Sequence, residues 1–294
     1  MALPKLVTKF LHRPPRVAVL RLSGAIGAAG RFGGGLSDAA LAPLVERAFR
    51  RSRPSAVALA INSPGGSPVQ SALIAARIRR LAAETDTKVF AFCEDVAASG
   101  GYWLAAAADE IYADPTSVVG SIGVISAGFG LHELIARYGV ERRVHTAGDS
   151  KSLLDPFRPE NPEDLERLRR ILDGIHAEFI AHVRDRRGAK LSDADLFTGE
   201  VWLGRAAVET GLIDGLGHLV PRMKEIYGDK TRFTVVTPRR SLFQRLGAPG
   251  AGGPGALPPF RNPAEDSDSA LARSLVSGTL DALEDRALWA RYGS

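Results

Sequence analysis

Residues 96–103, which read Val-Ala-Ala-Ser-Gly-Gly-Tyr-Trp, place one hydroxyl where a predicted strand gives way to a predicted helix. The strand covers residues 88–93, and the helix covers residues 100–108. A serine between small residues at such a turn presents its Oγ outward, beside the unpaired N–H groups of the first helical turn. This arrangement supplies a nucleophile together with part of an oxyanion hole. The alternative is that Ser99 only caps the helix beside close-packed glycines.

Strands and helices alternate on both sides of this turn. Apolar and alternating runs predict further strands at residues 17–22, 56–61, around 111, 121–126, 140–147 and 232–237. Helical spacing predicts helices over residues 36–50, 69–83 and 132–138, and a long helix that Asn161 and Pro162 open and that runs to residue 187. This rhythm predicts an α/β fold in which β-β-α units surround a largely parallel sheet.

The long helix carries one apolar face, which we expect to be buried along its length. The residues of this face are Leu165, Leu168, Ile171, Leu172, Ile175, Phe179 and Val183. They recur at the spacing that places side chains on one side of a helix.

Composition excludes several classes of protein. The chain has 294 residues, 45% of them hydrophobic and 24% charged, which is ordinary for a soluble globular protein. The net charge of +5 comes without a dense Lys/Arg cluster interleaved with aromatic residues, so we do not expect nucleic-acid binding. The single cysteine, Cys93, excludes an intrachain disulfide and a Cys-based zinc site. We expect neither a metal nor a cofactor.

The chain divides into four predicted parts. Residues 1–16 form a basic amphipathic arm, which either lies on an anionic membrane surface or docks on the body or on a neighbouring subunit. Residues 17–237 form the globular body, residues 238–269 a Gly/Pro-rich linker, and residues 270–294 an amphipathic C-terminal helix. No run approaches the ~18 apolar residues of a spanning helix, and no secretory signal is recognisable. We therefore expect a cytoplasmic or peripherally membrane-associated protein.

A Gly-rich turn, Asn62-Ser-Pro-Gly-Gly66, follows the predicted strand at residues 56–61. Its glycines can bring backbone N–H groups to an anionic oxygen. A phosphate cradle is the rival interpretation, but neither the dinucleotide fingerprint nor a Gly-Lys-Ser/Thr ending is present.

The serine needs a base, which is either a histidine or a lysine. Of the six histidines, His145 is the best positioned, yet it lies in a strand pattern without an orienting carboxylate. A desolvated lysine amine has a lowered pKa and can accept the serine proton. Lys151, which precedes an apolar pair, is the lysine candidate, although most lysines are solvated surface residues.

Four segments together resemble the signal peptide peptidase A family of serine proteases, of the SppA/SohB type and in its short single-copy form. They are Asn62-Ser-Pro-Gly-Gly66, Ala97-Ala-Ser-Gly-Gly-Tyr102, Gly120-Ser-Ile-Gly-Val124, and Lys151-Ser152 followed by Asp155-Pro-Phe157. Residues 197–214 also look like the family's downstream signature, and the likeness covers roughly residues 17–220.

The resemblance implies a Ser-Lys dyad. Ser99 is then the nucleophile and Lys151 the general base, and Ser121 matches a family serine that holds the amine toward the nucleophile. The N–H of Gly100, with that of Gly65 or Gly66, is implied as the oxyanion hole. The sequence does not decide between these two glycines.

The family also implies a fold and an assembly. The implied fold is the ClpP/crotonase-like spiral of β-β-α units, with residues 17–237 as the peptidase domain. In the duplicated relatives serine and lysine come from different halves, so in this single-copy chain we expect a ring-like homo-oligomer whose dyad joins neighbouring protomers.

The function predicted is a serine endopeptidase that cleaves hydrophobic peptides such as signal-peptide remnants. Two alternatives remain open. One is a crotonase-type acyl-CoA enzyme, which needs carboxylates in its site, and the other is a non-catalytic membrane-associated scaffold.

Overall fold

The computed structural model describes residues 14–27, 35–51, 53–148, 151–192 and 194–238. Its strands are β1 (Arg16–Ser23), β2 (Ala56–Ser63), β3 (Lys88–Ala98), β4 (Glu110–Ala113), β5 (Val118–Gly120), β6 (Val201–Leu203), β7 (Gly215–Leu216) and β8 (Arg232–Val235). Its helices are α2 (Asp38–Arg50), α3 (Pro68–Thr85), α4 (Gly100–Ala106), α5 (His132–Arg137), α6 (Pro162–Arg187), η1 (Gly188–Lys190), α7 (Gly204–Glu209) and α8 (Leu219–Tyr227). The expected N-terminal arm to residue 13, the linker from residue 239 and the C-terminal helix lie outside the described residues.

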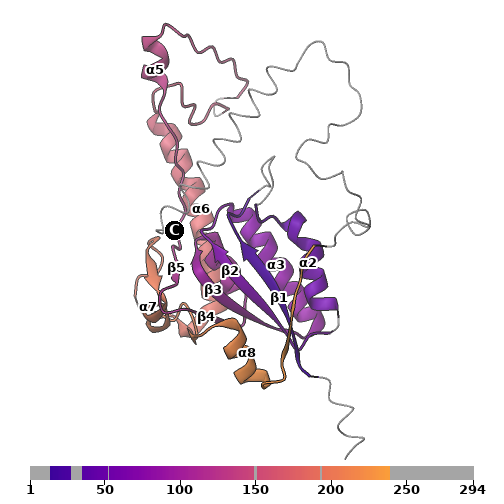
Figure 1. Cartoon of the computed structure of the whole chain (residues 1–294). Coiled ribbons are helices and arrows are strands. Elements are labelled where there is room, and N and C mark those ends of the chain that lie inside the picture. The colour runs from indigo at the N-terminus through magenta and orange to yellow at the C-terminus, as the bar shows by residue number, and fades with distance from the viewer. Residues whose placement is uncertain (1–13, 28–34, 52, 149–150, 193, 239–294) are drawn as a thin grey trace, which may run out of the picture.

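A mostly parallel sheet holds the fold together (Figure 1). Its strand order is β6-β5-β3-β2-β1-β8, and β4 joins β3 to β7 at the side of this path. Within the described residues, the antiparallel pairing is that of β5 with β6, and the other pairings are parallel. The predicted α/β class with a largely parallel sheet is therefore confirmed.

Local sequence explains where the helices begin. Ser67 caps α3 by accepting a hydrogen bond from the Gln70 N–H, and Pro68 occupies the first turn, where its missing N–H costs nothing. The Asn161 side chain caps α6 in the same way through the Glu163 N–H. The predicted start of the long helix is thus confirmed.

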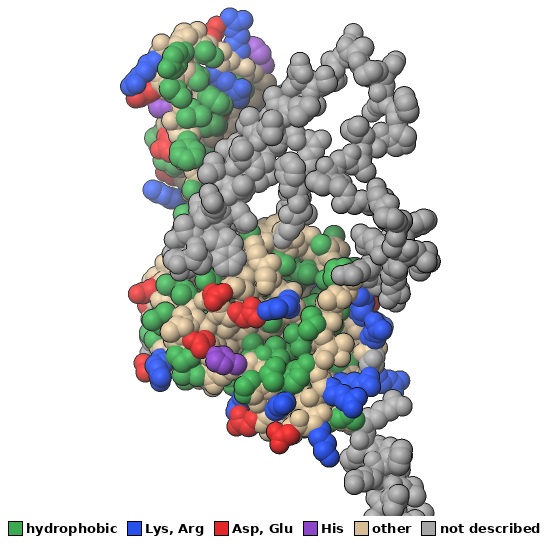
Figure 2. All heavy atoms as spheres, viewed as in Figure 1, with side chains coloured by type: hydrophobic (Ala, Val, Ile, Leu, Met, Phe, Trp, Pro, Cys, Tyr) green, Lys and Arg blue, Asp and Glu red, His purple; other side chains and the backbone are tan. Residues whose placement is uncertain are grey.

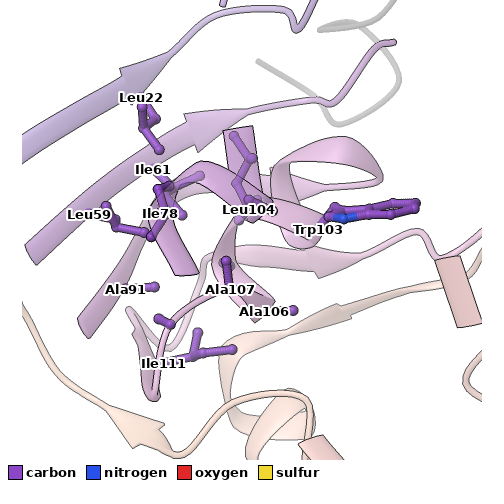
Figure 3. Close-up of a cluster of buried hydrophobic side chains, with 14 of the residues drawn as sticks. Leu22, Leu59, Ile61, Ile78, Ala91, Trp103, Leu104, Ala106, Ala107 and Ile111 are labelled. Atoms are coloured by element: carbon purple, nitrogen blue, oxygen red, sulfur yellow. The ribbon is translucent and has the colours of Figure 1, made fainter. Parts of the chain in front are cut away.

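Helices cover the two faces of the sheet unequally. The larger apolar cluster joins α2, α3 and α4 to one face, and includes Leu22, Leu59, Ile78, Leu104 and Ile111, all fully buried (Figure 3). A smaller cluster on the other face packs around Met223 of α8. Unbroken apolar strands are typical of a sheet that is covered on both faces.

Strand β3 changes partners along its length. Its first half pairs with β4 up to Cys93, and its last residues pair with β5 from Val96 onward. The register against β2 shifts between Ile61 and Ser63, so β3 carries extra residues at this point. Such a bulge re-aims the end of a strand, and here the end of the strand leads directly into Ser99.

A segment projects away from the sheet between β5 and α6. The projecting segment, residues 124–148 and 151–160, carries α5 at its far end, and the first half of α6 leads back to the body (Figure 1). The strands predicted at residues 121–126 and 140–147 were wrong, because these residues have no strand conformation. Their apolar residues meet no neighbouring strand in the described part of the chain.

The apolar face predicted for α6 is buried only over the second half of the helix. Phe179 and Val183 are buried, whereas Ile171 is 52% exposed. The projecting segment also leaves large apolar side chains uncovered, and Figure 2 shows hydrophobic side chains on the surface of this lobe. These exposed residues are Ile125, Phe129, Leu134, Tyr138, Val140 and Leu154.

Candidate active site

Ser99 lies on a strained turn between β3 and α4. Its φ of 50° and ψ of −121° are unusual for a residue with a side chain, and such a conformation costs about 1–3 kcal/mol. Two hydrogen bonds hold it: the Ser99 N–H donates to the Gly120 carbonyl at 2.8 Å, and the Ser99 carbonyl accepts from the Trp103 N–H at 3.0 Å. The side chain makes no capping hydrogen bond. The geometry therefore favours an Oγ free for chemistry over a capping role.

Two glycines of the turn after β2 pack closely, Gly65 against Ser99 and Gly66 against Ile26. A Cβ on Gly65 would lie 2.7 Å from the Ser99 Cβ and 2.8 Å from the Gly100 nitrogen. A Cβ on Gly66 would lie 2.0 Å from the Ile26 carbonyl oxygen. Both glycines have positive φ, so only glycine satisfies the conformation and the close contact together.

Hydrogen bonding distinguishes the two glycines. The Gly65 N–H already donates to Ser63 Oγ at 3.3 Å. Ile26 pairs with the residues on either side of Gly66, through the Gly65 carbonyl at 2.7 Å and the Ser67 N–H at 2.6 Å. In the part of the chain that the structure describes, the N–H groups of Gly66 and of Gly100 at the start of α4 have no protein acceptor.

A cavity of about 650 Å³ opens in front of Ser99. Its walls come from the Gly66 turn, the start of α4, the residues after β5, helix α6 and the Thr198-Gly199 pair. The residues that line it are Pro64, Gly66, Pro68, Ser99, Gly100, Trp103, Ser121, Gly123, Val124, Ile125, Ile175, His176, Phe179, Thr198 and Gly199. None of these described lining residues is an aspartate, glutamate, lysine or arginine.

Ser121 lies on the same cavity, directly after β5. It has a φ of 51°, and its N–H donates to the Glu200 carbonyl at 2.7 Å. Only 9% of the residue is exposed. The structure thus brings Ser121 and Ser99, two of the predicted site residues, to one cavity.

Lys151 is not among the residues that line this cavity. It is exposed on the projecting segment, where its N–H donates to the Gly148 carbonyl at 3.3 Å. Within the described residues of a single chain, the lining of the Ser99 cavity therefore does not include the predicted base.

The sequence analysis missed one polar residue of the cavity, His176 of α6. Its Nε2 lies 3.1 Å from the Ile122 carbonyl oxygen. The sequence offered no local signal for it, although its helix-mates Phe179 and His182 both stack on Trp103 of α4 in the structure. His145, the histidine that the sequence analysis judged best positioned as a base, is exposed on the projecting segment.

Cys93, metal ligands and membrane-spanning helices were the other features considered. Burial raises the pKa of the Cys93 thiol to about 12, so this cysteine is protonated at neutral pH and is a poor nucleophile. The described residues contain no cluster of three or more His, Cys, Asp or Glu that could hold a metal ion. Among the helices that the structure describes, none has the length and apolarity needed to cross a membrane.

Comparison with known proteins finds similarity to one family of peptidases. Residues 82–226 match the model described as peptidase family S49. A Synechocystis sp. protein named "Putative protease slr0021" is 30% identical over 238 residues, which cover 79% of this chain and 82% of that protein. The chloroplastic serine protease SPPA of Arabidopsis thaliana is 34% identical over 69% of this chain and 31% of its own length.

A Brucella melitensis protein is more similar but much longer. It bears the name Na(+)/H(+) antiporter NhaA and is 49% identical over 99% of this chain. The chain spans only 39% of that protein. Among solved structures, a membrane-bound stomatin-specific protease has a TM-score of 0.45 at 11% identity, covering 78% of this chain and 100% of that one.

Proposed function

Because the chain belongs to peptidase family S49, we propose that it is a serine endopeptidase with Ser99 as its nucleophile. One observation carries this proposal: Ser99 lies on a strained strand-to-helix turn, with an uncapped side chain facing a cavity and beside two unused backbone N–H groups. An activated alcohol and preorganised N–H donors are the two requirements for acyl transfer.

The oxyanion hole in this proposal consists of the Gly66 and Gly100 N–H groups. Gly66 is preferred to Gly65 because the Gly65 N–H already donates to Ser63 Oγ. The Gly100 N–H belongs to the first turn of α4, where no helical partner exists for it and where the helix dipole favours negative charge.

The general base is Lys151 of a neighbouring protomer. Two features support this assignment. Lys151 is exposed on the projecting segment. The same segment carries exposed apolar side chains, among them Phe129 and Tyr138, which are 83% and 78% exposed. Exposed apolar surface of this kind marks protein–protein contacts. When the segment docks on a second copy, the amine loses water and reaches the Ser99 cavity, where Ser121 orients it.

The chemistry then runs in two halves. The neutral amine takes the proton from Ser99 Oγ as Oγ bonds to the peptide carbonyl carbon, and the carbonyl oxygen becomes an oxyanion at the Gly66 and Gly100 N–H groups. The ammonium returns the proton to the leaving nitrogen, and the C–N bond breaks to leave an acyl ester on Ser99. Water, deprotonated by the same amine, attacks the ester, and the ammonium returns the proton to Ser99 Oγ as the C–O bond breaks and the acid leaves.

The substrate class follows from the cavity wall. An uncharged lining with Trp103, Ile175 and Phe179 favours apolar side chains and disfavours charged ones, because a buried charge without a partner is costly. Hydrophobic peptides such as remnants of signal peptides fit this requirement.

A fluorophosphonate probe tests the proposal. We expect the full-length protein to be labelled at one serine and Ser99→Ala to lose the label, whereas Ser55→Ala, an exposed serine before β2, keeps it. Labelling that survives in Ser99→Ala would overturn the proposal. Turnover of acyl-CoA thioesters without cleavage of apolar peptides would favour a crotonase-type enzyme instead.

A further inference from the structure

We propose that His176 is a positioning residue that holds the Gly120–Ile122 segment, and through it the Ser99 turn, in the reactive conformation. This inference rests on the proposed function. His176 lines the Ser99 cavity from α6, and its Nε2 lies 3.1 Å from the Ile122 carbonyl oxygen, so Nε2–H donates this hydrogen bond.

The segment that His176 contacts is strained. Gly120 has a φ of 105° and Ser121 a φ of 51°, a conformation that residues with side chains rarely adopt. Such backbone persists only where its surroundings hold it at several points. Ser121 therefore keeps its orientation toward the cavity only while these contacts last.

Contacts from two sides hold the segment in the described structure. The Ser121 N–H donates to the Glu200 carbonyl at 2.7 Å, the Ile122 side chain is fully buried, and the Ile122 carbonyl accepts from His176. The first two come from the sheet side of the segment. The His176 contact comes from α6, on the far wall of the cavity.

The same segment is bonded to the nucleophile. The Gly120 carbonyl accepts from the Ser99 N–H at 2.8 Å, two residues from the carbonyl that His176 holds. A continuous path thus leads from His176 through Ile122 and Gly120 to the backbone of Ser99. Without His176 the Ile122 carbonyl loses its partner, and the strained segment relaxes toward ordinary backbone angles.

The position of α6 itself is secured independently of this contact. Trp103 of α4 stacks on Phe179 at 4.7 Å and on His182 at 5.1 Å, and the His182 Nε2 lies 3.0 Å from the Trp103 carbonyl. Buried Arg187 bonds to the Gly211 carbonyl and to Asp214. Replacing His176 therefore removes one hydrogen bond and leaves the helix in place.

The imidazole acts here as a donor and not as a base. Both the neutral tautomer with the proton on Nε2 and the imidazolium donate to Ile122, so protonation of His176 leaves this contact intact. A glutamine amide at position 176 can also donate, whereas leucine cannot. This difference separates positioning from proton transfer.

The test compares His176→Leu, His176→Gln and a control, His218→Leu, which removes an exposed histidine that pairs with Asp114 away from the cavity. In His176→Leu we expect kcat and the rate of fluorophosphonate labelling to fall about 10- to 100-fold, with KM within about threefold, because small misplacements of reacting groups cost rate. We expect His176→Gln to retain activity within about threefold with an unchanged pH profile, and His218→Leu to match the parent.

Hydrogen exchange gives a readout that does not depend on catalysis. We expect the Ser121 and Gly123 amides to exchange faster in His176→Leu and normally in His176→Gln. Unchanged exchange and labelling in His176→Leu would overturn the inference, and so would a His176→Gln protein that is inactive and has lost one limb of its pH profile. If the parent protein itself is not labelled, the proposed function fails while the exchange result still decides the role of His176.

Discussion

Replacing Gly66 by alanine tests whether the turn beside Ser99 is built around a missing side chain. Gly66 has a φ of 140°, and an added Cβ would lie 2.0 Å from the Ile26 carbonyl oxygen. That oxygen belongs to backbone and accepts from the Ser67 N–H at 2.6 Å, while the Ile26 N–H donates to Gly65 at 2.7 Å. The new methyl group therefore has to displace the bridge between these two loops.

The size of the effect follows from two contributions. Forcing alanine into this backbone conformation costs about 1–3 kcal/mol. Losing the two hydrogen bonds to Ile26 costs about 1 kcal/mol each. We expect the free energy of unfolding of Gly66→Ala to fall by about 3–5 kcal/mol. For a body of this size that lowers the melting temperature by roughly 6–20 °C, since each kcal/mol is worth about 2–4 °C.

Thermal unfolding followed by circular dichroism measures this change against Gly27→Ala. Gly27 lies beside Ile26, lacks the positive φ, and would place a Cβ with no atom of the described residues within 4 Å. We expect the control to melt with the parent protein. The predicted drop is at least about 6 °C. If Gly66→Ala instead melts within about 2 °C of Gly27→Ala, close packing does not explain why this turn has a glycine.

Three further predictions concern α6. Burial lowers the pKa of His182, so the unfolded chain binds a proton there at a higher pH than the folded protein does. The unfolding free energy measured in urea should therefore fall as the pH drops below about 6.5. In His182→Gln this fall should be smaller. Arg187→Met removes the 2.8 Å ion pair with Asp214, which keeps Lys190 at 2.6 Å, and also the buried hydrogen bonds to the Gly211 carbonyl; it should lower the unfolding free energy by about 3 kcal/mol, and a loss below ~0.5 kcal/mol would argue against a stabilising role for these contacts. Gly174→Ala places a Cβ in open space on the helix and should raise the unfolding free energy by about 0.5–1 kcal/mol; a decrease would mean that α6 tolerates no added side chain there.

The sequence predicted best what depends on local periodicity. The buried strand at β2, the helices α3 and α4, and the Asn161 cap of α6 all lie where apolar runs, helical spacing and capping residues indicate. The strand-to-helix turn at Ser99 was also predicted from the sequence, because small residues between a predicted strand and a predicted helix are typical of such a turn.

The errors arose where tertiary contacts decide. Residues 121–126 and 140–147 have strand-like composition but no neighbouring strand to pair with in the described structure, and β propensity without a partner does not make a strand. The apolar stripe of α6 was correct as a pattern, yet Ile171 is exposed because the body reaches only the second half of the helix. Periodicity shows which face is apolar but not what covers it.

Site residues were predictable only where a motif contains them. The choice between Gly65 and Gly66 depends on which N–H is already bonded, and that information lies in the fold alone. His176 was overlooked since a histidine within a long helix carries no local signal; its role depends on a carbonyl 54 residues away in sequence.

Mixing two inactive variants tests the central claim most directly, namely that Ser99 of one protomer works with Lys151 of its neighbour. Ser99→Ala and Lys151→Met proteins are each expected to be inactive, and co-assembly should restore part of the parent's cleavage of an apolar peptide. At an interface between the two variants, one of the two possible subunit orders places the intact Ser99 of one subunit beside the intact Lys151 of the other. Continued inactivity after demonstrated subunit exchange, or full activity in Lys151→Met alone, would contradict the account.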